Sequence, residues 1–74
     1  MELKTALQRG SKLLEEAGVS PARLTAEVLL CHALGKDKPY LYAHSDEELS
    51  QPAWIHYGRY LHERMEGKPT QYIT

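Results

Sequence analysis

Residues 20–35 read SPARLTAEVLLCHALG, and this stretch decides the fold because it has the pattern of a helix that is apolar on two sides. Ser20 before Pro21 is typical of an N-cap with proline at the first helical position, and Gly35 is typical of a helix end. The small and apolar residues are Ala22, Ala26, Leu29, Leu30 and Ala33 on one side and Leu24, Val28 and Cys31 on the other. A helix with two apolar sides needs neighbours on both. We therefore expect a central helix over residues 21–34.

The segments before and after it predict two more long helices. Over residues 2–17 small and apolar residues recur every three or four positions, and Gly18 follows as a left-handed helix end. This apolar face consists of Leu3, Ala6, Leu7, Gly10, Leu13, Leu14 and Ala17. Ser50 before Gln51-Pro52 predicts the start of the last long helix, which runs up to Gly67. We expect its apolar residues to be core rather than a platform for stacking bases; they are Trp54, Tyr57, Leu61 and Met65.

Gly10 lies on the apolar face of the first helix. Its missing side chain would let a neighbouring helix approach closely, at a cost of about 1 kcal/mol in helix propensity relative to alanine. A glycine that is merely tolerated explains the sequence equally well.

Two shorter pieces connect the second and last long helices. Asp37 predicts the cap of a short helix through Pro39 and Tyr42, and Ser45 with Glu48 has the form of a capping box that predicts one turn. The sequence thus predicts an all-α fold, a small antiparallel bundle of three long and one or two short helices. Residues 1–66 form the bundle, and residues 67–74 form an extended linker or first strand.

Composition limits the classes of protein to which the chain can belong. With 74 residues, 42% of them hydrophobic and 26% charged, it is one small globular domain rather than a disordered segment. Its net charge of -1 provides no overall field for nucleic acid or an anionic membrane. The sequence shows no signal-peptide pattern and no apolar run of membrane-spanning length. A single cysteine cannot form an internal disulfide, which favours a cytoplasmic protein.

No catalytic or metal site is indicated by spacing. Cys31 and His32 are adjacent, but neighbouring residues of a helix point about 100° apart, so we expect a buried, inert thiol. The four histidines lack the i, i+4 spacing of a helical metal site, and we expect them at or near the surface. They are His32, His44, His56 and His62.

Binding motifs are equally sparse. The five glycines are scattered singly, so no phosphate-binding loop is predicted. Arg23 and Glu27 predict either a solvated ion pair of small worth or a partly buried pair that orients neighbouring helices. A helix-turn-helix around Gly35 is disfavoured because the third helix is short and has just Lys36 and Lys38 nearby. The residues alone indicate a small helical module without catalytic machinery, for which nucleic-acid binding is disfavoured.

Two stretches have a more specific pattern. In residues 20–35 the positions concerned are Arg23, Ala26, Glu27, Leu29 and Leu30; in residues 64–74 they are Arg64, Gly67, Pro69, Gln71, Tyr72 and Ile73. On these positions the chain resembles the N-terminal domain of the HemK/PrmC family, the glutamine methyltransferases that modify peptide chain release factors. Thr25 departs from the pattern, because an acidic residue is usual there. The second stretch is the more specific, since Gly-Lys-Pro-x-Gln-Tyr-Ile directly after an amphipathic helix is uncommon.

The resemblance implies a Rossmann-like methyltransferase domain beyond Thr74. In the family that domain binds S-adenosylmethionine on a Gly-rich loop, and an Asn-Pro-Pro-Tyr motif orients the glutamine of the release factor's Gly-Gly-Gln sequence. Neither motif occurs in this chain. We therefore expect no catalytic, cofactor-binding or metal-binding residues in it, and no enzyme activity of its own.

The resemblance leaves a role in recognition for the bundle. We expect residues 1–66 to help dock or position the release factor, and residues 67–74, where Tyr72, Ile73 and Thr74 favour a strand, to lead into the catalytic domain. Two alternatives stay open. The bundle aids the folding of the catalytic domain without touching the substrate, or it is a stand-alone helical interaction module.

Overall fold

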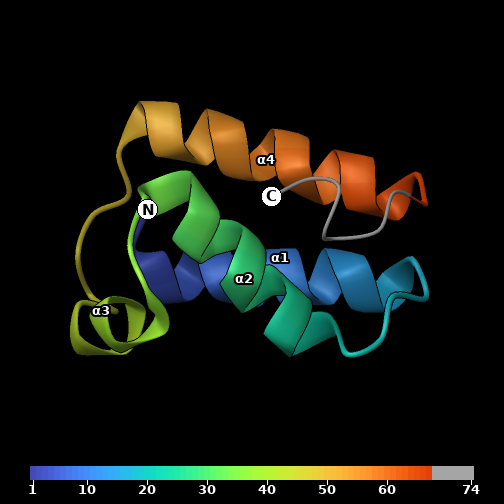
Figure 1. The fold of residues 1–74 in the computed structure, drawn as a ribbon, viewed down its shortest axis with the longest axis horizontal. Helices are drawn as coiled ribbons and strands as arrows, with labels where there is room; N and C mark the ends of the chain where they lie inside the picture. Colours follow the sequence, from blue (N-terminus) through green and yellow to red (C-terminus); the bar gives the residue numbers. More distant parts are fainter. Residues whose placement is uncertain (68–74) are drawn as a thin grey trace.

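A computed structural model describes residues 1–67, in which the chain forms four α-helices. They are α1 (Leu3–Glu16), α2 (Ala22–Leu34), α3 (Lys38–Ala43) and α4 (Gln51–Met65). Figure 1 shows α1 and α4 running in the same direction, α2 crossing back between them, and the short α3 at the end of the molecule where α1 begins. Because α2 contacts each of the other three helices, the prediction of an all-α bundle around this helix is confirmed.

Helix ends agree with the predictions to within one residue, and most of them have a local capping signal. The side chains of Asp37 and Ser50 each accept a hydrogen bond from the backbone N–H three residues further on. Gly18 and Gly35 follow α1 and α2 with left-handed backbones, at φ 82° and 69°. Glycine adopts this conformation without the steric cost that a side chain brings.

Ser20 is not the N-cap of α2, contrary to the prediction. Pro21 occupies that position with an extended backbone, no side chain caps the helix, and α2 begins at Ala22. The backbone N–H and the hydroxyl of Thr25 both donate to the Pro21 carbonyl, at 3.2 and 2.7 Å. The helical hydrogen-bond pattern therefore starts from Pro21, one residue later than predicted.

The segment between α3 and α4 makes the predicted turn around Ser45 and then pairs with the start of the chain. The N–H groups of Leu3 and Lys4 donate to the carbonyls of Glu47 and Ser45, at 3.0 and 2.9 Å. These bonds satisfy donors of the first helical turn that no carbonyl of the same helix can reach. A distant segment, rather than a side chain of its own, therefore caps α1.

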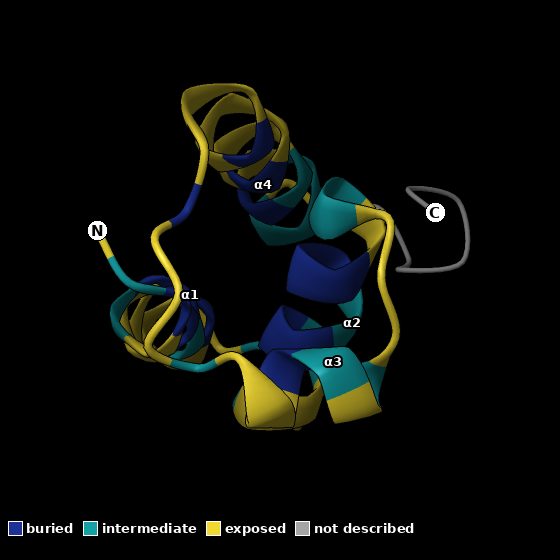
Figure 2. Ribbon diagram, turned by 90° about the vertical axis from the view of Figure 1, so that its left-hand side faces the viewer, coloured by how far each residue is buried: buried dark blue, intermediate teal, exposed yellow. Residues whose placement is uncertain are grey.

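The core lies where α1, α2 and α4 face one another, as the buried residues in Figure 2 show. Its largest fully buried side chain is Tyr57, whose hydroxyl donates to the Ala6 carbonyl at 3.2 Å. A Cβ atom at Gly10 would lie 1.8 Å from that hydroxyl oxygen. Gly10 is therefore required for the close approach of α4 to α1. Of the two interpretations of this glycine, close helix packing is the one that the structure supports.

Four small or apolar residues expected on buried faces lie at the surface instead, and one of them is Ala17, just past the end of α1. Trp54 is 37% exposed, whereas Tyr57 and Leu61 of the same predicted set are buried, and Met65 is partly buried. Leu13 and Leu24 are each nearly half exposed. The three large side chains lie at the edge of an apolar face, where no neighbouring helix covers them.

Candidate functional site

The family-pattern residues of α2 are mainly core residues. Ala26, Leu29 and Leu30 have no exposed surface, and all three belong to the cluster that joins α1, α2 and α4. These side chains pack in the contact between the helices, where a substitution that changes side-chain volume lowers the free energy of unfolding. This part of the pattern therefore encodes the packing of the bundle.

Glu27 is buried, and each of its carboxylate oxygens accepts a hydrogen bond. Arg23 Nε donates to Oε2 at 3.3 Å, and the hydroxyl of Tyr42 on α3 donates to Oε1 at 2.9 Å. Glu27 is 8% exposed, whereas the Arg23 side chain is 60% exposed. The structure thus supports the partly buried pair, the second interpretation of this spacing, and Tyr42 supplies the contact to a neighbouring helix.

The hydrogen bond to the Glu27 carboxylate raises the pKa of Tyr42, because it stabilises the protonated phenol. This hydrogen bond makes a polar tie between α3 and α2. Sequence reasoning missed Tyr42 because 15 residues separate it from Glu27 and no local spacing marks the pair.

The second family pattern begins in the last turn of α4. The buried Nε of Arg64 has no hydrogen-bond partner among residues 1–67. Gly67 has a left-handed backbone with φ 100°, and its N–H donates to the Arg64 carbonyl at 3.1 Å, so glycine suits this position. The remaining pattern residues lie outside the described part of the chain; they are Pro69, Gln71, Tyr72 and Ile73.

Cys31 is buried, and burial raises the pKa of its thiol. A protonated thiol is a poor nucleophile, which agrees with the inert cysteine predicted. The four histidines are exposed. In the described range, 1–67, no three His, Cys, Asp or Glu side chains are grouped so that they could hold a metal ion. Within the same range, no helix has the length and apolar character needed to cross a membrane.

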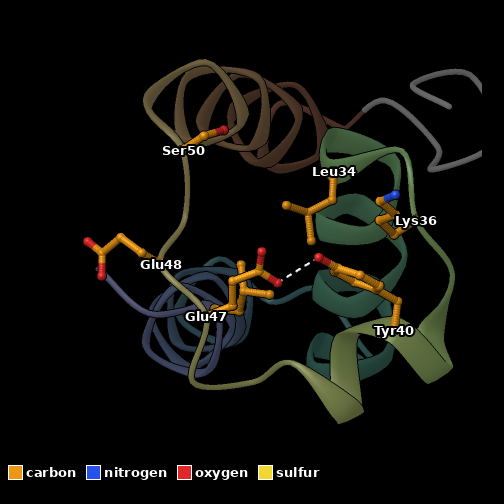
Figure 3. A pocket seen from close by; sticks show the side chains of 7 residues that line it. Leu34, Lys36, Tyr40, Glu47, Glu48 and Ser50 are labelled. Atoms are coloured by element: carbon orange, nitrogen blue, oxygen red, sulfur yellow. Dashed lines mark hydrogen bonds between the residues drawn. The ribbon is translucent and has the colours of Figure 1, made fainter.

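A hollow of about 130 Å³ lies between the end of α2, α3 and the segment before α4 (Figure 3). Its lining consists of Leu3, Leu34, Lys36, Tyr40, Glu47, Glu48 and Ser50. The Tyr40 hydroxyl donates to Glu47 Oε2 at 2.6 Å, which raises the pKa of Tyr40, and Lys36 Nζ lies 5.2 Å from the centre of the Tyr40 ring. These contacts hold the segment against α3 and use polar groups that a ligand would need.

Another surface feature is the N-terminal half of α4, which presents apolar residues to solvent. Ile55 is 60% exposed, and Trp54 borders an open hollow of about 300 Å³ that is also lined by Met1, Leu49 and Gln51. The Leu49 N–H donates to the Met1 carbonyl at 2.7 Å, so the start of the chain is held beside α4. The sequence had indicated Trp54 as core, and neither its exposure nor the hollow was predicted.

Comparison with known proteins identifies a family whose members the chain resembles in sequence. The chain matches a family model described as the PrmC N-terminal domain over residues 5–74, a range that contains both patterned stretches. It is similar to the release factor glutamine methyltransferase of Koribacter versatilis, with 38% identity over all 74 residues, which cover 26% of that protein. The corresponding protein of Vibrio cholerae is 34% identical over 71 residues, which cover 96% of this chain and 25% of that protein.

A third relative has a broader name. The bifunctional methyltransferase of Rickettsia conorii is 31% identical over 72 residues, which cover 97% of this chain and 14% of that protein. The chain thus spans about a quarter of the length of the release factor glutamine methyltransferases described above. No solved structure is significantly similar to the chain.

Proposed function

This chain belongs to the PrmC N-terminal domain family, and we propose that it helps a release factor glutamine methyltransferase to dock or position its protein substrate. The proposal rests on the family match over residues 5–74, together with the finding that the chain spans about a quarter of the length of the methyltransferases it matches. Methyl transfer, and the binding of S-adenosylmethionine, then belong to the part of the enzyme that follows this domain.

Docking of this kind has a clear physical use. The amide nitrogen of the substrate glutamine must be held in line with the methyl group, and contacts far from the reacting atoms can supply the binding energy for that orientation. A bundle with a close-packed centre, in which α2 contacts the other three helices, is a stable support for such contacts. The polar tie through Glu27 fixes α3 on the same support.

The test is deletion of residues 1–66 from the full-length enzyme, followed by assays on two substrates. One substrate is the intact release factor, and the other is a short peptide with the Gly-Gly-Gln sequence. We expect a large loss of kcat/KM for the intact factor and little change for the peptide, because the peptide reaches the catalytic domain alone. Equal losses of kcat/KM for the two substrates would contradict the docking role.

A second candidate function is purely structural, and the burial of the α2 pattern favours it. Ala26, Leu29 and Leu30 are core residues, so this pattern is explained without any substrate contact. In that case the bundle stabilises the catalytic domain. A thermal melt of the shortened enzyme distinguishes the two functions: a lower melting temperature, with unchanged activity per folded molecule on both substrates, supports the structural one.

A further inference from the structure

We propose that residues 44–48 form a strap that lifts away from the start of α1 while the core stays folded, with the hydrogen bond between Tyr40 and Glu47 as its latch. This inference concerns a movement built into the fold. It goes beyond the proposed function and does not depend on the docking role.

The strap has no buried side chain to hold it in place. The buried residues nearest to it are Leu41 and Leu49, which are 2% and 7% exposed. Between these two leucines, none of the residues 42–48 is buried. Local opening costs least where few apolar contacts must be broken. The strap can therefore lift between two anchored ends without disturbing the core.

Backbone hydrogen bonds join the strap to the start of the chain. Its carbonyls at Glu47 and Ser45 accept from the N–H groups of Leu3 and Lys4, and Glu48 forms an antiparallel bridge with Glu2. Each such bond contributes little to net stability, because water bonds to the same groups once they separate. Lifting the strap thus frees two donors of the first turn of α1 at a small cost.

The side chain that fastens the strap is Tyr40 of α3. Its hydroxyl donates to Glu47 Oε2 at 2.6 Å, and Figure 3 shows this bond at the exposed edge of the hollow. Its ring stacks on the imidazole of His44, with the ring centres 4.0 Å apart. Tyr40 therefore contacts the strap at His44 and at Glu47, and it sits next to the buried Leu41. A fixed side chain that contacts two points of a loosely packed segment acts as a latch.

The strap closes one side of the hollow of about 130 Å³, in which Glu47 and Glu48 lie opposite Leu34 (Figure 3). Leu3 also lines this hollow and is 1% exposed, and Leu34 is partly buried against the core. When the strap lifts, these two leucines form an apolar floor beside the freed N–H groups of Leu3 and Lys4. The open form thus has an apolar surface and unpaired donors that the closed form hides.

A second tyrosine on α3 provides a matched control. The hydroxyl of Tyr42 also donates to a glutamate, but this residue is Glu27 on α2 and not part of the strap. Opening of the strap alone breaks the bond of Tyr40 and leaves the bond of Tyr42 intact. Global unfolding breaks both. The same substitution at the two positions therefore separates a local movement from the unfolding of the whole domain.

The experiment measures amide hydrogen exchange by nuclear magnetic resonance in the wild type, Tyr40→Phe and Tyr42→Phe. Both substitutions remove a hydroxyl and keep the ring, so both variants should fold. We expect the amides of Leu3, Lys4 and Glu47 to exchange about fivefold faster in Tyr40→Phe, the effect of losing one hydrogen bond. In Tyr42→Phe these three amides should keep their wild-type rates, while those of Leu29 and Leu30 exchange faster because global stability is lower.

Other results would overturn the strap. Unchanged exchange of Leu3 and Lys4 in Tyr40→Phe would mean that the start of α1 frays by itself and that Tyr40 is no latch. Equal acceleration of these amides in both variants would mean that they exchange through opening of α3 or through global unfolding. Neither readout involves methyl transfer, so failure of the strap would leave the docking role to be judged by the deletion of residues 1–66.

Discussion

At the scale of single residues, Gly10 and Gly58 occupy helix interiors with opposite surroundings. An alanine Cβ at Gly10 would lie 1.8 Å from Oη and 2.7 Å from Cζ of Tyr57, so overpacking of about 1–3 kcal/mol should exceed the helix-propensity gain. Among residues 1–67, no atom lies within 4 Å of the place where a Cβ of Gly58 would be. We expect Gly10→Ala to lower the free energy of unfolding, and Gly58→Ala to raise it by about 0.5–1 kcal/mol. Urea denaturation of the two variants measures both. Shifts in the same direction would contradict the packing described here.

Burial of Tyr57 also predicts a pH dependence of stability. Loss of water around the side chain raises the pKa of Tyr57 above its ordinary value of 10.0. Because the folded-state pKa is the higher one, the unfolded chain loses this proton first. The stabilising contribution is complete below pH 10 and is lost as the pH rises beyond it. We expect stability to fall less steeply above pH 10 in Tyr57→Phe than in the wild type; parallel denaturation curves would refute this.

Burial of single residues was harder to predict than helical spacing. Tyr57, Leu61 and Trp54 share the expected spacing, yet Trp54 alone of the three borders an open hollow. Tyr57 is covered because α1 has a glycine at the point of contact. Which element covers a side chain depends on residues far away in the sequence, and periodicity within one helix does not contain that information.

At the scale of helices and loops, local chemistry explains which ends were predictable. Asp37, Ser50 and Gly35 lie next to the helices that they cap, and each cap is present. The capping of α1 by residues 45–47 could not be predicted, because it joins segments more than forty residues apart through backbone atoms that have no sequence signature. The family pattern was visible in the sequence, but the role of Glu27 needed the position of α3.

The hydrogen bonds of Glu27, one of which joins α2 to α3, predict an order of stability among three variants. Glu27→Ala removes the acceptor for both Arg23 and Tyr42, and we expect it to lower the free energy of unfolding by about 1–3 kcal/mol. Arg23→Ala should cost less than about 1 kcal/mol, because this side chain is largely exposed. Tyr42→Phe should fall between them. The order is measured by denaturation, and an Arg23→Ala variant as unstable as Glu27→Ala would show that the exposed ion pair dominates.

At the scale of the whole molecule, the packing order predicts where the fold opens first. The central α2 touches every other helix, whereas α3 has six residues and a single buried one, Leu41. Local opening is easiest where few apolar contacts must be broken. We expect the slowest amide hydrogen exchange at Leu29 and Leu30 and fast exchange in α3. Nuclear magnetic resonance of the exchanging protein gives these rates, and equal protection in α2 and α3 would contradict this order.

The capping of α1 by the segment before α4 has a consequence for synthesis on the ribosome. Glu47, whose carbonyl accepts the Leu3 N–H, follows Leu3 by 44 residues. At about 5–20 residues per second, translation takes roughly 2–9 s to cover that distance. During this time the first turn of α1 lacks the carbonyl that will complete it. Although α1 is translated before the other three described helices, it is thus finished only after α2 and α3 have been made.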